Sequence, residues 1–167
     1  MGTRNLTIVK SKGKTKVAQY GQWDGYPTGQ GQTIADFLKK VDLPKFKKQI
    51  ESLGEYTEED IRQAYKDAGH DGVSEWITSD ISDKKNAAHP ALCRDYGAGI
   101  LRMIHEGITT KVDLCEGFKE DKLMCEYCYE IDLDNETVSV NDGKKYTFKQ
   151  WTRKGFMQKL EDTEGEE

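Results

Sequence analysis

The sequence contains no long hydrophobic run. No apolar stretch approaches the ~20 residues that a membrane-spanning helix requires, and the opening MGTRNLTIVKSKGK has no apolar segment of the kind found in signal peptides. The four cysteines, without a secretion signal, are expected to be reduced thiols. We therefore expect a cytoplasmic protein with no membrane partner.

Motifs for metal binding and for common catalytic reactions are also missing. His70, His89 and His105 lie far apart, and the GxSxG, P-loop and complete GxGxxG patterns are absent. Cys125 and Cys128 form a CxxC, but residues three apart on a strand point to opposite faces, so we expect their sulfurs to diverge. A zinc ribbon would need a second such pair. The sequence predicts no metal and no cofactor.

Positive charge is in deficit. The chain has 25 Lys and Arg against 30 Asp and Glu, a net charge of −5. This balance disfavours broad binding to nucleic acid or to anionic membranes. Lys10, Lys12, Lys14 and Lys16 surround the first predicted turn, where lysines commonly protect a sheet edge. We interpret them as a solvated edge rather than as an anion site.

The two ends of the chain have the patterns of β-strands. Residues 5–10 and 15–21 predict a hairpin, because they are rich in β-branched and aromatic side chains around a turn glycine. Residues 124–133, 137–140 and 144–148 predict a three-stranded meander. Strands at both ends usually meet in one sheet. We therefore predict an α+β fold, with one antiparallel sheet covered by helices from the middle of the chain.

Apolar residues at helical spacing predict four helices, over residues 32–41, 44–53, 58–68 and 90–106. Residues 150–160 are interpreted as a closing helix or loop, and the stretch between His70 and His89 as short helical turns and loop around a buried Trp76 and Ile77. A single domain is expected over residues 1–160, followed by a disordered acidic tail over 161–167.

The stretch AQYGQWDGYPTGQGQ (residues 18–32) carries the functional candidates. Its aromatic side chains can stack on a flat ligand, its amides and aspartate can read polar edges, and its last glycines lead into a helix start that favours an anion. Arg94 is a phosphate partner, or else forms an ion pair between helix and sheet. The predicted ligand-binding residues are Arg4, Gln19, Tyr20, Gln22, Trp23, Asp24, Tyr26, Gln30 and Arg94. The alternative is that Trp23 and Tyr26 cap the core.

Three stretches, GTRNLT…KVAQYGQWDGYPTGQG, HPALCRDYGAGIL and CEYCYEIDLDNETV, resemble a family of small proteins encoded by phages and bacteria. The resemblance covers most of the chain, and its first motif is highly specific. It implies a role in host takeover or counter-defence, including sequestration of a host nucleotide signal in the host cytoplasm.

The opening TRNLTIVKSKGKTKVAQYGQWDG is also similar to the first hairpin of N-terminal-nucleophile hydrolases. Those enzymes use a free N-terminal Thr, Ser or Cys as nucleophile and base. Here Thr3 follows Met1 and Gly2, so removal of the methionine would expose a glycine that has no nucleophile.

Three hypotheses follow. The first is an accessory protein that binds a small nucleotide-like ligand around the DGYP loop (residues 24–27). The second is a hydrolase of a nucleotide or amide, with Asp24 as general base and Arg4 or Arg94 stabilising charge. The third is a protein-binding inhibitor of a host enzyme. We favour binding over catalysis. Nucleic acid is not an expected partner, and a homo-oligomer is compatible with each hypothesis.

Overall fold

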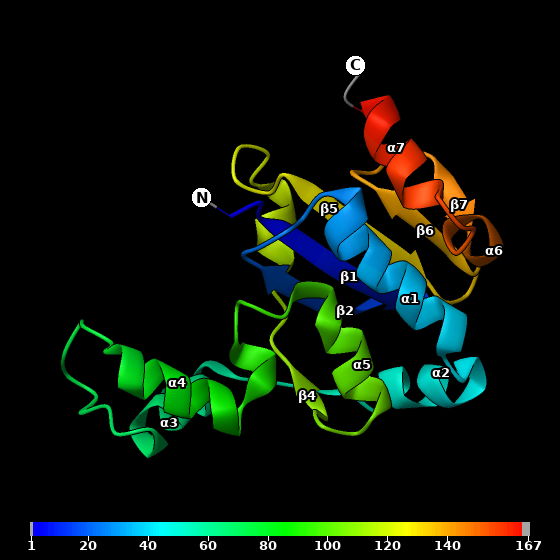
Figure 1. Ribbon diagram of the computed structural model, residues 1–167. Coiled ribbons are helices and arrows are strands. Elements are labelled where there is room, and N and C mark those ends of the chain that lie inside the picture. The colour runs from blue at the N-terminus through cyan, green and yellow to red at the C-terminus, as the bar shows by residue number, and fades with distance from the viewer. Residues whose placement is uncertain (1, 165–167) are drawn as a thin grey trace.

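The computed structural model describes residues 2–164, and a five-stranded sheet lies at its centre (Figure 1). Its strands, in spatial order, are β2 (Lys14–Gly21), β1 (Asn5–Ser11), β5 (Tyr127–Asp132), β6 (Thr137–Val140) and β7 (Lys145–Thr147). The predicted α+β class is confirmed, because the N-terminal hairpin and the C-terminal strands share this sheet.

The central pair of strands departs from the prediction of a wholly antiparallel sheet. β1 and β5 run parallel, with Asn5 opposite Tyr127 and Lys10 opposite Asp132, whereas the other neighbours are antiparallel. Parallel neighbours need a long crossover, and the helical middle of the chain provides it. Side-chain alternation could not reveal this direction, because it has the same period in both kinds of pair.

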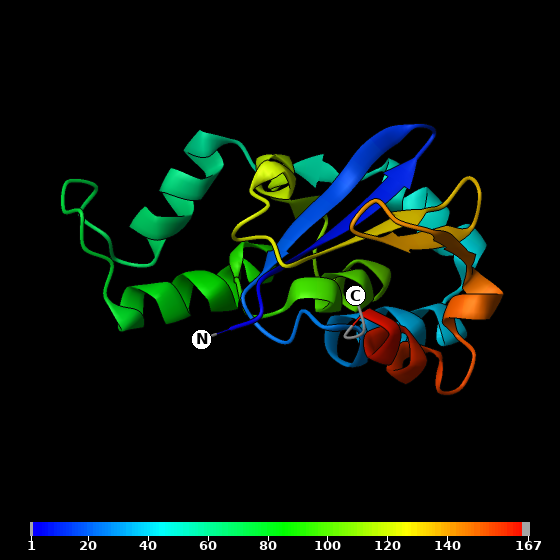
Figure 2. The ribbon, with the colours of Figure 1, turned by 90° about the horizontal axis from the view of Figure 1, so that it is seen from above.

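The two faces of the sheet are covered differently. One face packs on helices α1 (Gln32–Lys40), α2 (Leu43–Glu51), α5 (Ile100–His105), α6 (Phe148–Trp151) and α7 (Phe156–Glu164). Figure 2 shows α1, α5 and α7 on the same side of the sheet. The other face carries Leu6, Ile8 and Ala18 beneath the short helix η4 (Glu116–Glu120). Burial of the first face supplies the main core, since apolar area removed from water is the dominant favourable contribution to folding.

A helical arm leaves this body. It consists of α3 (Glu58–Asp67) and α4 (Ser79–Ala88), and both figures show it extending away from the sheet. Thr57 and Asp60 form a reciprocal capping box at the start of α3, which confirms the predicted N-terminus of that helix. Beside the arm, β3 (Gly54–Glu55) and β4 (Lys111–Val112) form a short parallel pair.

The helix predicted over residues 90–106 is broken into three pieces. They are η2 (Pro90–Leu92), η3 (Gly97–Gly99) and α5. Gly97 has φ +50°, and a Cβ atom there would lie 2.8 Å from Oε1 of Gln30. Only glycine combines this backbone conformation with so close an approach, so helical spacing of the apolar residues overstated the helix.

Two further expectations differ from the structure. Trp76 and Ile77 are not buried, since they are 85% and 42% exposed. The predicted disordered tail begins inside a helix, because α7 continues to Glu164; residues 165–167 lie outside the described part of the chain.

Cys125 and Cys128 do not diverge as predicted. β5 begins only at Tyr127, so Cys125 precedes the strand, and both thiols pack in the small cluster with Leu6 and Ile8. A hydrogen bond with Cys125, together with burial, raises the pKa of Cys128. Among residues 2–164, no group of three or more His, Cys, Asp or Glu side chains could hold a metal ion. No helix of that segment has the length and apolar character needed to cross a membrane.

Candidate functional site

The DGYP loop is held in one conformation by the core beneath it. Gly25 donates its N–H to the carbonyl of Thr3 (3.0 Å), and its own carbonyl accepts the hydroxyl of buried Tyr129 (2.5 Å). A Cβ atom at Gly25 would lie 2.7 Å from the Thr3 oxygen. Asp24 has φ +54°, an uncommon conformation that Asp tolerates better than most residues. The loop is therefore a fixed part of the fold.

Two of the predicted ligand-reading amides are used inside the protein. Gln30 accepts the N–H of Ala98 (2.8 Å) and donates to the carbonyl of Trp23 (3.1 Å). Gln19 is buried and donates to the carbonyl of Ala91 (3.1 Å). Buried polar groups need such partners, so both amides join segments of the chain. The Oε1 of Gln19 has no partner among the described residues, but Gln19 is buried and cannot reach a ligand at the surface.

A second group of predicted residues lies together on the Trp23 side of the loop. The indole N–H of Trp23 donates to Oδ1 of Asp95 (2.8 Å), and the hydroxyl of Tyr20 donates to Gln22 (2.5 Å). The N–H of Gln22 donates to the carbonyl of Arg94 (2.9 Å). These contacts attach the end of β2 to the segment before η3.

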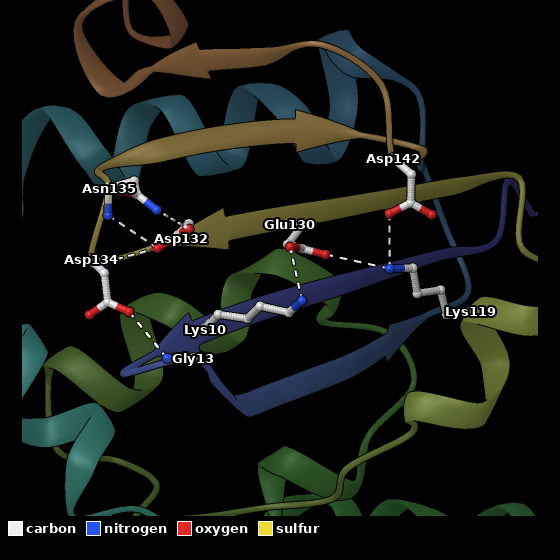
Figure 3. A network of polar contacts seen from close by, with 8 residues as sticks. All are labelled: Lys10, Gly13, Lys119, Glu130, Asp132, Asp134, Asn135 and Asp142. Carbon is white, nitrogen blue, oxygen red and sulfur yellow. Dashed lines mark hydrogen bonds and ion pairs between the residues drawn. The ribbon is translucent and has the colours of Figure 1, made fainter.

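The expected ion pair between Arg94 and the sheet is not formed with any described residue. Arg94 is exposed, and Glu130 instead binds Lys10 (3.1 Å) and Lys119 (3.5 Å). Lys119 also binds Asp142 (2.9 Å), as Figure 3 shows. Lys10 therefore lies in an ion-pair network across β1 and β5, and because β1 is an interior strand, Lys10 does not belong to the solvated sheet edge that we predicted.

Tyr26, on the other side of the loop, lines a groove of about 1060 Å³. The groove lies between α7 and the strands β5–β7 with their connecting turns. Tyr26, Tyr127 and Tyr146 supply its aromatic walls, and Glu126, Glu161 and Glu164 supply carboxylates. Its size is that of a ligand pocket. We call it the tyrosine groove.

The carboxylates in and beside the tyrosine groove raise the pKa values of nearby tyrosines. The pKa of Tyr127 is raised, first by burial and then by the negative charges of Glu164, Glu161 and Glu126. The pKa of Tyr26 is raised chiefly by its hydrogen bond to Asp24, whose Oδ1 accepts its hydroxyl (2.9 Å). The tyrosine groove therefore has a negative potential and favours cationic or hydrogen-donating groups.

The anion position predicted at the helix start is already filled. Oε2 of Glu161 accepts the N–H of Thr28 (3.1 Å) at the beginning of the π-helix η1 (Pro27–Gly31). A carboxylate is the group that a helix N-terminus attracts. The carboxylate that occupies this position belongs to α7 of the same chain.

A second pocket adjoins the first and has the opposite charge. It has a volume of about 350 Å³ and shares Lys144, Tyr146, Leu160 and Thr163 with the tyrosine groove. Lys144, Arg153, Lys154 and Lys159 line it, and none of them forms an ion pair with another residue of the described chain. The N-terminus of α7 adds positive potential there. We call it the cationic pocket.

The nine predicted site residues are thus divided. Tyr26 lines the tyrosine groove, and Asp24 reaches it by contacting Tyr26. Arg4 is adjacent, because its backbone N–H donates to Oε2 of Glu126 (3.0 Å), and its buried Nε has no partner among the described residues. The other six lie outside both pockets: Gln19, Tyr20, Gln22, Trp23, Gln30 and Arg94.

Most residues of the two pockets escaped prediction from the sequence. They come from the C-terminal strands and α7, where polar residues alternating with apolar ones are typical of any half-exposed element. One signal was present: Tyr146 follows two lysines, and Arg153 and Lys154 precede the start of α7. A cation-rich helix start favours anion binding.

Comparisons with known proteins found no match, whether with family models, with curated proteins or with solved structures.

Proposed function

We propose that the protein binds a small nucleotide-like ligand across the two adjoining pockets. One observation carries the proposal: a pocket with tyrosines and carboxylates shares Lys144 and Tyr146 with a pocket of unpaired cations. A nucleotide has the same division, with a flat, hydrogen-donating end and an anionic end.

The tyrosine groove suits the base and the sugar. Tyr26, Tyr127 and Tyr146 supply its aromatic surface. The Tyr127 ring is stacked on Tyr129 and the Tyr146 ring contacts Phe156 and Lys144, so we assign the stacking role first to Tyr26. Carboxylates accept hydrogen bonds from amino groups and hydroxyls, which bases and sugars carry. Glu126 and Glu161 line the groove wall, and since their Oε2 atoms accept the N–H groups of Arg4 and Thr28, their Oε1 atoms are the ones assigned this role.

The cationic pocket suits the phosphate. Arg153 offers a planar fork that matches phosphate oxygens, and the three lysines add point charges. The carboxylates of the tyrosine groove repel phosphate, so the charges of the two pockets favour a single orientation of the ligand. In the counter-defence role that the family resemblance implies, this ligand would be a host nucleotide signal.

Isothermal titration calorimetry with the four ribonucleoside 5′-monophosphates and the matching nucleosides tests the proposal. We expect at least one monophosphate to bind about tenfold or more tightly than its nucleoside. Lys154→Glu combined with Lys159→Glu should remove that difference, while Lys149→Glu, at an exposed position of α6 outside both pockets, should preserve it. Equal affinity for nucleosides and nucleotides, or no binding of either, would contradict the proposal.

A hydrolase is the second candidate, favoured by the contact of Asp24 with Tyr26 at the edge of the groove. Mass spectrometry of the ligand recovered after the titration distinguishes the two. Intact ligand supports binding alone. A hydrolysed product that is formed by the wild type and lost in Asp24→Asn supports Asp24 as general base.

A further inference from the structure

The end of the helical arm presents apolar side chains to solvent. Residues 71–80 are all exposed, and within them Val73 is 87% and Trp76 85% exposed. Both views show the connection between α3 and α4 at the far end of the arm (Figures 1 and 2). We call residues 69–78 the tip loop. An indole this exposed keeps most of its apolar surface in contact with water, so Trp76 is accessible to a partner.

The tip loop has a defined shape although it lacks a core. Oδ1 of Asp71 accepts the N–H groups of Val73 (2.9 Å) and Ser74 (2.8 Å). His70 accepts the N–H of Gly72 (3.0 Å), and its other ring nitrogen lies 3.0 Å from the carbonyl of Ser74. These local bonds hold Val73 and Trp76 outward. A loop that is ordered before binding loses less entropy when it docks.

The arm that carries the loop is fixed to the body. Lys85 of α4 is buried, and its Nζ donates to the carbonyl of Leu92 (3.2 Å) and to the hydroxyl of Tyr65 (3.4 Å). The same Nζ lies 4.9 Å from the centre of the Tyr65 ring. Lys85 therefore ties α3, α4 and the body together, while neither helix of the arm contributes to the main core.

Charge restricts what the tip loop can contact. Residues 69–78 contain Asp71 and Glu75 and no Lys or Arg, whereas the next acidic residue, Asp80, is paired with Lys84 (3.1 Å), and the Lys66 side chain lies against Gly72. Anionic membranes and nucleic acid would repel this surface. A symmetric contact between two copies would bring the same carboxylates together, which like-charge repulsion disfavours.

We infer that the tip loop is the docking element for a partner protein, with Trp76 and Val73 entering an apolar pocket that lysines and arginines surround. Tryptophan in a desolvated pocket commonly carries much of a binding energy, and complementary charge around it accelerates association. The site is remote from the two pockets in the fold, so ligand binding and docking can be tested separately.

Photo-crosslinking through the tip loop tests this inference. Benzoylphenylalanine replaces Val73 in the full chain, and the adducts formed in a lysate of the cells that express the protein are mapped by mass spectrometry. We expect one crosslinked peptide beside an apolar pocket rich in Lys and Arg. Adducts only with another copy of this chain, or no protein adduct, would overturn the inference.

The purified partner then permits a quantitative test. Trp76→Ala should weaken its binding by about 30-fold or more, and Glu75→Lys should slow association. Leu123→Ala is the matched control, because Leu123 is equally exposed (86%) but lies elsewhere. Thermal melting checks that each variant is folded. Unchanged affinity in Trp76→Ala, or a blue shift of Trp76 fluorescence on phosphatidylcholine or phosphatidylserine vesicles, would overturn the inference.

Discussion

Two loops of this protein, residues 21–31 and the tip loop, each contain a tryptophan, glycines and at least one acidic residue, but their polar side chains have different partners. In residues 21–31, the polar groups bind the rest of the fold: Gln30 connects Trp23 to Ala98, and Trp23 contacts Asp95. In the tip loop, the polar groups bind one another, and Trp76 is twice as exposed as Trp23 (85% against 43%). Loops of similar composition therefore have different roles: residues 21–31 are hydrogen-bonded to the rest of the fold, whereas the tip loop exposes an apolar side chain to solvent.

The largest effect should come from breaking the first loop. Gln30→Ala removes the acceptor of the Ala98 N–H and the donor to the Trp23 carbonyl, and it leaves a cavity beside Gly97. We expect a loss of about 2–4 kcal/mol in the free energy of unfolding, measured by urea denaturation. Trp76→Ala should change it by less than about 0.5 kcal/mol. Similar losses in the two variants would refute the contrast between the loops.

The part of the fold that local chemistry determines was predictable. The hairpin was visible in its β-branched strands and turn glycine, and the start of α3 in its Thr57 cap. The break at Gly97 and the parallel pairing of β1 with β5 were not, because both depend on what lies opposite in space. The exposure of Trp76 was missed for the same reason: an apolar residue is expected inside unless its surroundings are known.

The candidate site was predictable only at one edge. Tyr26 was identified because aromatic residues on a glycine-rich loop are typical of ligand sites. The amides beside it suggested the same role, yet Gln19 and Gln30 satisfy backbone groups that only the folded chain brings near. The charges of the two pockets come from segments a hundred or more residues away, so no local pattern joined them to Tyr26.

A smaller effect should follow from loosening the arm. Lys85→Ala removes the donor to the Leu92 carbonyl and the contact with Tyr65. Loss of one buried hydrogen-bonding group costs about 1–3 kcal/mol, and here the loss should fall on α3 and α4. Hydrogen exchange should accelerate in residues 58–88 and remain unchanged in residues 21–31. Acceleration in both segments would mean that the arm and the first loop form one cooperative unit.

The smallest expected effect is a pH dependence of the tip loop that the first loop should not share. Backbone N–H groups of Ser74 and Val73 hold the pKa of Asp71 below its ordinary value, with His70 adding a lesser contribution. Because the folded pKa is depressed, the stabilisation by this carboxylate is complete above the unfolded pKa of about 3.9. It is lost as pH falls through the lower folded value. The hydrogen bonds of Gln30 join amide groups, which do not titrate in this pH range, so the first loop should not respond to this change of pH.

NMR titration of the backbone amides therefore provides the sharpest form of the comparison. The Val73 and Ser74 amide signals should shift with a midpoint below the ordinary Asp pKa, while the Ala98 amide, bound by Gln30, should not follow that titration. Asp71→Asn keeps an acceptor oxygen and should abolish the titration without freeing the loop, whereas Asp71→Ala should free it at every pH. If the Val73 and Ser74 amides titrate at or above the ordinary value, Asp71 does not order the tip loop, and the order of that loop must then come from the His70 contacts alone.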